Sequence, residues 1–464
     1  MATTLEDIRS PFDGSVVGQA PVATLADVDL AISTAVNGAA LWRKTPAHIR
    51  SAILLKAAQL ADERQEEIAQ IISSENGKSL IEARGEASRS GEIIRLAAFE
   101  GSQLYGTTLP LDANKGTGRE KFGFTMRQPV GVVVAISPFN YPALLVLHKI
   151  APALAVGNSV VLKPARTTPL TALALAKCFT DAGLPDGVLN VITGSGALLG
   201  DALVSDKRVR KVSFTGSTIT GTRIASIAGI KKLSLELGSS CPVVVLDDAD
   251  IEFAAEAIAL GGYINAGQVC ISVQRVIVQE NVMADFLAAL QPKVEAIKIG
   301  DPKAEGTKVG TLISEVEAKR VEACIAQAVK DGGKLITGGE RSGTLIKPAI
   351  IGSVDPRAAI AQDELFGPAI AVSSATSAAH AIELANSTAY GLGAGVFTKN
   401  IDFALQSARE IEAGIVHINW TPLWRADLMP YGGLKESGIG KEGVRSTVEE
   451  MTEVKTVILH GKSY

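Results

Sequence analysis

Cysteine is the side chain in this sequence best suited to covalent chemistry, and Cys270 stands in a context that exposes it. It follows the segment Asn-Ala-Gly-Gln-Val (265–269), between an apolar helical stretch and a strand. Most cysteines act as small apolar side chains, but a Gly-Gln break predicts a loop, where functional residues concentrate. A thiolate there could add to an aldehyde carbonyl, and the adduct could deliver hydride to a nicotinamide.

Two further side chains could support such a thiol. Glu236 interrupts an apolar strand and is followed by Leu237 and Gly238. It is either an outward-facing strand residue or a general base, whose pKa partial burial would raise. Asn140, in Ser-Pro-Phe-Asn-Tyr-Pro (137–142), follows a strand and opens a helix. Its amide could cap that helix or, with the backbone N–H of Cys270, hold a developing oxyanion.

Glu-Leu-Gly at 236–238 is followed about thirty residues later by Gly-Gln-Val-Cys at 267–270. This pair of motifs resembles the signatures of the aldehyde dehydrogenase superfamily, and the resemblance covers essentially the whole chain. It implies that Cys270 is the nucleophile, Glu236 the general base and Asn140 the oxyanion donor. Lys149 and Glu442 match a supporting pair that relays protons from the base, although either could be a surface charge.

The same resemblance bears on the type of reaction. Acylating, coenzyme A-dependent relatives typically lack a glutamate at position 236, so its presence favours release of a free acid. A catalytically silent protein of the same fold is a further alternative, because fold alone does not guarantee activity. Ser239 and Ser240 replace the usual glycine and Lys or Asn. Ser239 occurs in the lactaldehyde and non-phosphorylating glyceraldehyde-3-phosphate branch, whereas no role for Ser240 follows from the sequence.

A dinucleotide site is indicated by the segment 214–221, which reads as a strand, a Gly-containing turn and a helix start. Helix N-termini favour phosphate, but the segment is not a GxGxxG motif and is a weak signal alone. Arg166 replaces a glutamate that binds ribose hydroxyls in NAD-preferring members, and a cation suits a 2′-phosphate. We therefore expect NADP, with NAD or dual use as the alternative, unless Arg166 turns into solvent. The resemblance implies these cofactor-binding residues: Ser137, Pro138, Phe139, Lys163, Ala165, Arg166, Gly216, Ser217, Gly221, Leu237, Glu364 and Phe366.

The substrate pocket is less clearly marked. His148 lies eight residues after Asn140, on roughly the same helix face. The succinate-semialdehyde branch typically has arginine there, so His148 argues against that substrate. The candidate substrate residues are Tyr141, His148, Arg275, Trp420, Trp424 and Arg425. The two tryptophans form either an apolar wall or a subunit interface, and Arg425 or Arg275 could hold an anionic tail. Lactaldehyde, glycolaldehyde, a sulfonated or phosphonated aldehyde, and aliphatic or aromatic aldehydes all stay open.

The surrounding pattern predicts an α/β protein with a doubly wound parallel sheet. After helices at 25–41 and 49–73, four short apolar strands alternate with helices. The strands are expected at 132–136, 160–162, 188–192 and 212–214, and the helices at 143–155, 170–182, 197–204 and 221–228. A second α/β region, 242–416, has strands at 243–246 and 275–278 and helices at 251–266, 284–297 and 315–330.

We expect three structural parts. These are a dinucleotide-binding domain (1–112 and 130–238), a catalytic domain (239–444) and a small β oligomerisation element (113–129 and 445–464). The segments 118–128 and 448–460 resemble strands that pair between subunits, and soluble proteins tend to cover such edges. A homodimer or homotetramer is therefore predicted.

Composition excludes several other classes. The chain has 464 residues, long enough for roughly three domains, and a formal net charge of -4, which disfavours a nucleic-acid binder. Its four cysteines form no CxxC pair, and the first residues lack a signal-peptide pattern, so a cytoplasmic location is expected. No uninterrupted apolar tract of about 20 residues predicts a membrane helix. The five histidines show no metal-ligand spacing.

Overall fold

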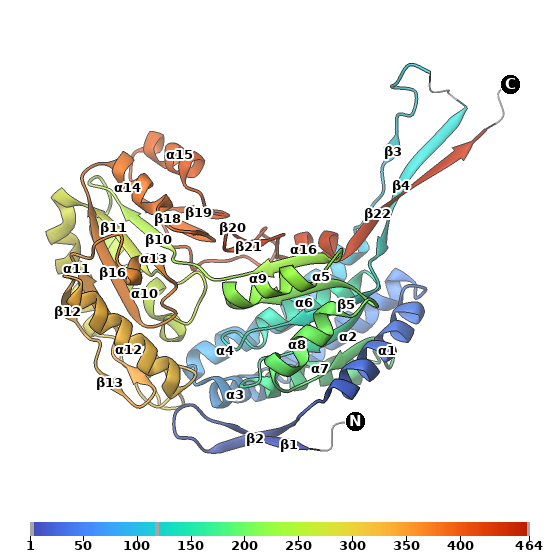
Figure 1. The fold of residues 1–464 in the computed structure, drawn as a ribbon, viewed down its shortest axis with the longest axis horizontal. Helices are drawn as coiled ribbons and strands as arrows, with labels where there is room; N and C mark the ends of the chain where they lie inside the picture. Colours follow the sequence, from blue (N-terminus) through green and yellow to red (C-terminus); the bar gives the residue numbers. More distant parts are fainter. Residues whose placement is uncertain (1–3, 117–119, 462–464) are drawn as a thin grey trace.

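Two largely parallel sheets, each covered by helices, make up most of the molecule (Figure 1). The computed structural model describes residues 4–116 and 120–461. The first sheet has the order β21-β9-β8-β5-β6-β7, and only the short β21 runs antiparallel. Its strands are β5 (Val132–Ile136), β6 (Ser159–Lys163), β7 (Leu189–Val191), β8 (Val209–Thr215), β9 (Lys232–Glu236) and β21 (Gly438–Ile439). The four predicted strands of this sheet are confirmed.

Helices cover both faces of this sheet, as expected for short apolar strands that are buried on both sides. Every residue of α6 is buried, which accounts for its apolar sequence. The four predicted crossover helices are confirmed, with ends that differ by at most three residues from the predicted ones. They are α6 (Leu144–Ala155), α7 (Pro169–Asp181), α8 (Gly196–Ser205) and α9 (Thr218–Ile227).

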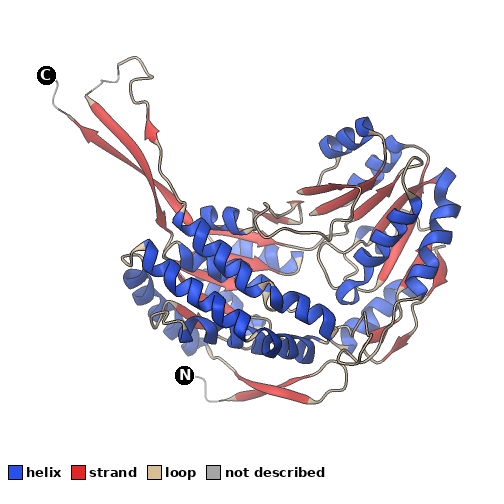
Figure 2. Ribbon diagram, turned by 180° about the vertical axis from the view of Figure 1, so that it is seen from behind, coloured by secondary structure: helices blue, strands red, loops and turns tan. Residues whose placement is uncertain are grey.

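The N-terminal part adds a two-stranded hairpin and five helices to the first sheet (Figure 2). The helix predicted at 25–41 is confirmed, but the single helix predicted at 49–73 is wrong. Arg64 leaves the helical conformation (φ -102°, ψ 15°) and its guanidinium bonds Asp181 of α7 at 2.5 Å. The elements are β1 (Leu5–Arg9), β2 (Val16–Pro21), α1 (Leu25–Trp42), α2 (Ala47–Glu63), α3 (Gln65–Asn76), α4 (Leu80–Ser88) and α5 (Ser90–Ser102).

The second sheet has the order β12-β15-β16-β11-β10-β18-β19, and its strands are parallel except β12. The strands are β10 (Pro242–Val245), β11 (Arg275–Gln279), β12 (Lys334–Thr337), β15 (Ala349–Gly352), β16 (Ala369–Ala375), β18 (Gly393–Phe397) and β19 (Ile415–Ile418). The helices against it are α10 (Ile251–Tyr263), α11 (Met283–Glu295), α12 (Glu315–Lys330), α14 (Ala378–Asn386) and α15 (Ile401–Glu410). The helix predicted at 251–266 ends early, at Tyr263, because Asn265 and Ala266 adopt left-handed backbone angles.

A long β arm projects from the first sheet unit (Figures 1 and 2). In it β4 (Lys121–Pro129) pairs antiparallel with β22 (Thr452–His460) along its whole length, and β3 (Thr108–Leu109) adds a short third strand. The strand predicted from residue 448 begins later. Residues 444–450 form α16 (Val444–Glu450), whose buried Val444, Thr447 and Val448 have helical spacing. Residues 118 and 119, predicted to start the other strand, lie outside the described residues.

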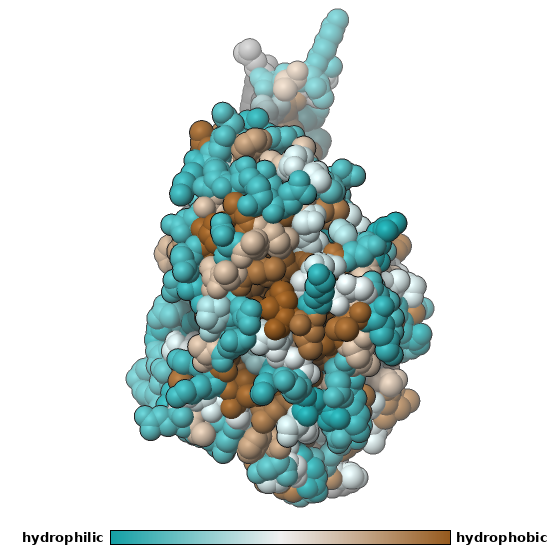
Figure 3. Space-filling model, turned by 90° about the vertical axis from the view of Figure 1, so that its left-hand side faces the viewer, coloured by the Kyte–Doolittle hydropathy of each residue, from teal (hydrophilic) through white to brown (hydrophobic). Residues whose placement is uncertain are grey.

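Two further observations concern the surface and membranes. Apolar side chains gather near the middle of the face formed by the second sheet and its helices (Figure 3). Within residues 4–116 and 120–461, no helix combines the length and apolar character that a bilayer crossing requires.

Candidate active site

Cys270 lies on a loop whose shape depends on three successive left-handed residues. Asn265, Ala266 and Gly267 have φ angles of 49°, 54° and 70°. Such backbone strain in non-glycine residues is typical of functional sites. At Gly267 no other residue fits, because a Cβ would lie 2.1 Å from the carbonyl oxygen of Gly367. This turn ends α10, so that Cys270 lies on a loop after the helix.

Gln268 holds this loop in place from inside the protein. Its buried side-chain amide donates to the carbonyl oxygens of Asn265 (3.1 Å) and Thr311 (3.2 Å). Its Oε1 accepts from the backbone N–H of Ile313 at 2.9 Å. Each residue of the Gly-Gln pair therefore has a structural role: Gly267 permits the turn, and Gln268 fixes its position.

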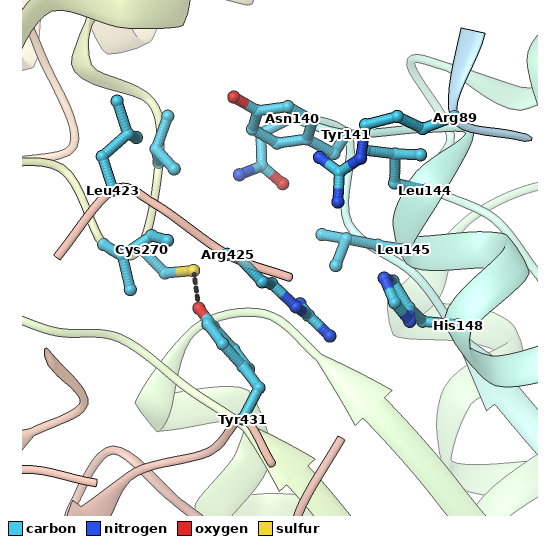
Figure 4. A pocket seen from close by; sticks show the side chains of 12 residues that line it. Arg89, Asn140, Tyr141, Leu144, Leu145, His148, Cys270, Leu423, Arg425 and Tyr431 are labelled. Atoms are coloured by element: carbon cyan, nitrogen blue, oxygen red, sulfur yellow. Dashed lines mark hydrogen bonds between the residues drawn. The ribbon is translucent and has the colours of Figure 1, made fainter. Parts of the chain in front are cut away.

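The thiol faces a small cavity between the two sheet units (Figure 4). The cavity has a volume of about 80 Å³. It is lined by Arg89, Asn140, Tyr141, Leu144, Leu145, His148, Val269, Cys270, Ile271, Leu423, Arg425 and Tyr431. Leucine, isoleucine and valine form its apolar wall, and two arginines and a histidine bring polar groups to it. Such a mixture is typical of small-molecule sites.

The environment of Cys270 favours the neutral thiol. Burial raises the pKa of this thiol to about 12, although a hydrogen bond with Tyr431, Sγ to Oη 2.9 Å, acts in the opposite direction. Only the thiolate is a strong nucleophile. The resting site therefore keeps the sulfur protonated, and a reaction there requires added positive charge or a proton acceptor.

Two hydrogen-bond donors converge beside Cys270. The Asn140 amide donates one N–H to the carbonyl oxygen of Gln268 at 2.9 Å, which leaves its second N–H available. Within the described residues the backbone N–H of Cys270 has no partner. Two such donors near a reactive sulfur can stabilise negative charge on a carbonyl oxygen. The structure thus brings together the residues that the sequence suggested for an oxyanion site.

Glu236 is the last residue of β9 and is only 2% exposed. Neither carboxylate oxygen has a hydrogen-bond partner among the described residues. Burial, and then the negative charge of Glu442, raise its pKa well above the usual value. Gly432 makes room for the carboxylate, since a Cβ there would lie 2.7 Å from Oε1. A carboxyl group held this way can accept a proton near neutral pH.

A buried ion group made of Lys149, Glu442 and Arg425 lies next to Glu236. Lys149 Nζ donates to Glu442 Oε1 at 2.8 Å and to Thr215 Oγ1 at 2.7 Å. The Arg425 guanidinium approaches Glu442 Oε2 at 3.3 Å and lies 4.0 Å from the ring centre of Tyr431. The pairing of Lys149 with Glu442 excludes the alternative that either is a surface charge.

A second ion group closes the far side of the cavity. His148 Nε2 lies 3.2 Å from Asp427 Oδ1, and the Arg89 guanidinium bonds the same oxygen. His148 is almost fully buried, as its place on α6 dictates. Asn140 precedes α6 rather than lying on it, but both residues line the same cavity as the sequence spacing predicted.

The predicted cofactor residues follow the carboxyl ends of β5, β6, β8 and β9, the edge where parallel sheets bind ligands. Ser137, Pro138 and Phe139 follow β5, and Leu237 follows β9. The hydroxyl of Ser137 is buried and has no partner in the described residues. Gly216 and Ser217 lead into α9, and Ser217 Oγ accepts from the backbone N–H of Thr220 at 3.3 Å.

Lys163, at the end of β6, has a strongly buried ammonium group. Burial lowers its pKa to about 8, and within the described part of the chain its hydrogen bond is to the Pro164 carbonyl oxygen at 3.2 Å. A ligand hydroxyl or phosphate would supply better partners. Near the start of α9, Gly221 packs tightly on Leu237, because a Cβ there would lie 2.3 Å from the leucine side chain. These features fit a dinucleotide.

Glu364 and Phe366 approach the same edge from the second sheet unit. Glu364 accepts a hydrogen bond from the backbone N–H of Ser239 at 3.0 Å, and burial raises its pKa to about 7. Phe366 has a left-handed backbone (φ 51°), and its ring packs edge-on against Phe139 with centroids 5.9 Å apart. The segment therefore lies beside the residues that follow β5.

Arg166 and Ala165 follow Lys163 at the end of β6. The Arg166 side chain is 58% exposed and forms a bidentate ion pair with Glu6 of β1, at 2.5–3.0 Å. An exposed pair of this kind contributes little to stability. Arg166 is thus near the surface, held by a carboxylate, and free to exchange that partner for another anion.

Three residues predicted for the substrate pocket lie elsewhere. Arg275 is buried, and its guanidinium donates to the carbonyl oxygens of Ser240, Leu384 and Ala385 at 2.9–3.0 Å, so it cannot hold a substrate. Trp420 packs on Phe253 at 5.6 Å between ring centres. Trp424 is 56% exposed and packs edge-on against His417. Neither tryptophan lines the cavity, so the predicted wall is wrong; Leu423 takes that place.

Sequence reasoning missed Arg89, Asp427 and Tyr431. Tyr431 stands in the segment Met-Pro-Tyr-Gly-Gly (429–433). Arg89 comes from a helical segment with no local signal of function. Ser240, whose role the sequence left open, is structural: its buried hydroxyl donates to the Ala361 carbonyl oxygen at 3.0 Å and accepts from Gln274. No cluster of His, Cys, Asp and Glu that could hold a metal occurs in residues 4–116 and 120–461.

Comparison with known proteins gives consistent results. The profile of the aldehyde dehydrogenase family matches residues 2–457. A 3-sulfolactaldehyde dehydrogenase from Priestia megaterium is 42% identical over 99% of this chain and 96% of its own. A lactaldehyde dehydrogenase from Methanocaldococcus jannaschii is 39% identical over 98% and 97%. The crystal structure of a glyceraldehyde-3-phosphate dehydrogenase from that organism, complexed with NADP, superposes with a TM-score of 0.94, at 39% identity over 98% of both chains.

Proposed function

Because this chain belongs to the aldehyde dehydrogenase family and is an NAD(P)-dependent aldehyde dehydrogenase, we propose that it oxidises small aldehydes with an anionic group at the far end, preferring NADP. The acid is released by hydrolysis. The proposal assigns roles to the residues of the cavity, described next, and a charge class to the substrate.

Cys270 passes its proton to the Glu236 carboxylate, which has no hydrogen-bond partner among the described residues, and its sulfur adds to the aldehyde carbon to form the thiohemiacetal anion. The oxygen that becomes negative receives hydrogen bonds from the Asn140 amide and the backbone N–H of Cys270, the two donors left free beside the sulfur. When bound, the oxidised nicotinamide supplies positive charge near the thiol and accepts the hydride. The acyl group is then held on Cys270 as a thioester.

Glu236 takes a proton from the water that hydrolyses this thioester. Its unpaired carboxylate and raised pKa suit a general base. The Lys149–Glu442 pair lies beside it and can pass the proton on. Release as a free acid needs this base, and its presence favours hydrolysis over transfer of the acyl group to coenzyme A.

The charge of the substrate follows from one observation: Lys149 and Arg425 share a single carboxylate, Glu442. In the other ion group, Arg89 and Asp427 balance each other. These pairs leave one positive charge over, which Glu236 offsets only when it is ionised, and burial keeps the pKa of Glu236 well above its usual value. The Arg425 Nε–H is buried without a partner among the described residues. Arg425 lines the cavity with Cys270. A substrate sulfonate, carboxylate or phosphonate would balance this charge.

The test is a substrate panel with both NAD and NADP, comparing lactaldehyde with 3-sulfolactaldehyde. We expect the anionic aldehyde to have the higher kcat/KM. In Arg425→Met this value should fall by about 10- to 100-fold for the anionic aldehyde, as for a lost charged hydrogen bond, and much less for the neutral one. Arg425→Lys, which keeps the charge, should lose less. An equal loss for both aldehydes would contradict the proposed anion contact.

NADP is preferred in this proposal because of Arg166. Its guanidinium is exposed and is bound, among the described residues, by the half-buried carboxylate of Glu6, so a 2′-phosphate could replace that partner. Lys163, buried near the same edge, would bind the adenosine ribose, and Glu364 the nicotinamide ribose. The M. jannaschii relative whose structure contains NADP supports the same choice.

We also propose the domain division at 238/239 and an oligomer built through the arm. β9 ends at Glu236 and β10 begins at Pro242, so the proposed boundary falls between the two sheets. β22 exposes Val454, Ile458 and Leu459. β22 is an edge strand of the arm, and exposed edge strands are normally covered in soluble proteins. Pairing of this arm with a second copy of the chain would cover them.

A further inference from the structure

His148 presents a buried hydrogen-bonding atom that no residue described in the structure bonds. The side chain lies on α6, is 1% exposed and lines the cavity that contains Cys270 (Figure 4). Its Nε2 lies 3.2 Å from Asp427 Oδ1. Its other ring nitrogen, Nδ1, is buried and has no partner among the described residues. An unsatisfied buried polar atom is unfavourable, and a ligand that bonds it removes that penalty.

The tautomer of His148 follows from its neighbours. Burial, reinforced by the positive charge of Arg425, lowers the pKa of the imidazole to about 4, so the ring is neutral at pH 7. Burial alone would raise the pKa of Asp427, but the bonds and charges of His148 and Arg89 outweigh it and lower the value to about 2. The Asp427 carboxylate is therefore ionised and can only accept. A neutral imidazole has one N–H, and Asp427 fixes it on Nε2.

Nδ1 is consequently a hydrogen-bond acceptor of fixed position. The cationic groups that line the cavity, Arg89 and Arg425, can only donate. Among the buried side-chain atoms without a partner in the described residues, Asn140 Oδ1 is the other acceptor on a lining residue, and it belongs to the side chain beside the reacting carbon. An acceptor further along α6 faces the rest of the substrate.

We propose that His148 Nδ1 accepts a hydrogen bond from a hydroxyl group on the carbon chain of the aldehyde, so that the natural substrate is a hydroxyaldehyde. This inference rests on the proposed function, because it requires that the aldehyde enters this cavity. It is separate from the anion contact, which involves Arg425. A site built to bond a hydroxyl discriminates against the analogue that lacks it, since its own polar atom is then left unpaired.

The experiment measures kcat/KM for pairs of aldehydes that differ only in a hydroxyl. The neutral pairs are lactaldehyde with propanal and 3-hydroxypropanal with propanal; the anionic pair is 3-sulfolactaldehyde with 3-sulfopropanal. We expect the wild-type enzyme to prefer the hydroxylated member of at least one neutral pair by about 10- to 100-fold. If the preference is seen for lactaldehyde, whose hydroxyl is on the second carbon, it should recur in the anionic pair, whose hydroxyl is at the same position.

Variants at His148 assign the effect to this residue. In His148→Phe the hydroxyl preference should disappear, whereas rates with propanal should change less. His148→Gln is the matched control: its amide can donate to Asp427 and keep a carbonyl oxygen in the cavity, so part of the preference should return. If the phenylalanine variant does not fold, as judged by its thermal midpoint, His148→Leu serves the same purpose.

The outcomes separate this inference from the proposed function. No hydroxyl preference in any wild-type pair, or a preference that survives both His148→Phe and His148→Leu, would overturn the role of His148. A hydroxyl preference without a preference for the sulfonate would support His148 and contradict the anion contact at Arg425. A sulfonate preference without a hydroxyl preference would do the reverse.

Discussion

Two buried glutamates, Glu86 on α4 and Glu236 at the end of β9, are treated in opposite ways by this protein. Glu86 has a partner for each oxygen: Oε1 accepts from the backbone N–H groups of Ala143 and Leu144, and Oε2 bonds Lys78 at 2.5 Å. Glu236 is equally buried and has no partner in the described residues. The first carboxylate joins helices, and the second is kept available for chemistry.

The contrast extends to the regions around the two residues. Lys78 also donates to the Asn140 carbonyl oxygen at 2.9 Å and lies 3.7 Å from the centre of the Tyr141 ring. The region of Glu86 thus fixes the loop that enters the site. Around Glu236, by contrast, His148 and Arg425 also have buried, unpartnered atoms. Buried charged groups whose hydrogen bonds are all made within the protein support the fold, whereas those with unpaired atoms indicate where a ligand is expected to bind.

The largest expected effect concerns Glu86, the glutamate that has a partner for each oxygen. Lys78→Met leaves the Glu86 carboxylate buried without its counter-ion, so we expect a loss of about 3–5 kcal/mol in unfolding free energy. Urea and thermal denaturation of the full-length protein measure it. Lys177→Met is the control, because Lys177 pairs with Asp181 at the surface and should contribute at most about 1 kcal/mol. Equal effects for the two variants would show that the buried pair has no special role in stability.

At the glutamate that has no partner in the described residues, the substitution Glu236→Gln should lower activity and raise stability together. Without the base, steady-state turnover should fall by roughly 10²- to 10³-fold, and the thioester on Cys270 should accumulate and be detectable by mass spectrometry. Stability should rise by about 1–3 kcal/mol at neutral pH, because an unpaired buried carboxylate is removed.

The pH dependence of that stability gain follows from the raised pKa of Glu236. The folded state holds the proton more tightly than the unfolded chain, so this residue lowers stability progressively as pH rises above about 4.5. The gain in Glu236→Gln should therefore be small at pH 4 and larger at pH 7. Glu86→Gln is the control and should destabilise the protein. If both variants changed stability in the same direction, the distinction between the two glutamates would be lost.

The sequence revealed the strands and the main site residues because both are local patterns. Short apolar runs predicted the four strands of the first sheet, and the Gly-Gln break predicted that Cys270 leaves its helix. What it could not reveal depended on distant partners. Arg64 interrupts a helix without any breaking residue, and Arg275 points at three carbonyl groups far along the chain. An arginine looks the same in a sequence whether it faces a pocket or a backbone.

The roles of Lys149, Glu442 and Arg89 also depend on partners that are distant in the sequence. Lys149 and Glu442 lie 293 positions apart and bond only because the fold brings α6 and the segment after β21 together. Arg89, which enters the cavity from the start of α5, has no sequence signal because its partner Asp427 is 338 positions away. The sequence therefore predicted which types of residue could take part in the chemistry, whereas deciding which individual residues do so required the contacts in the structure.

The smallest expected effect tests how Glu236 is tuned by its neighbours. Because burial and Glu442 raise its pKa, the acid limb of the hydrolysis rate should lie above the usual carboxyl range. Glu442→Gln removes the repelling charge, so the limb should move to lower pH, by about one unit or less. Arg425→Met removes an attractive charge and should move it to higher pH. Rates of thioester hydrolysis measured in single turnovers from pH 5 to 9 give both shifts, and equal directions would show that charge does not set the basicity of Glu236.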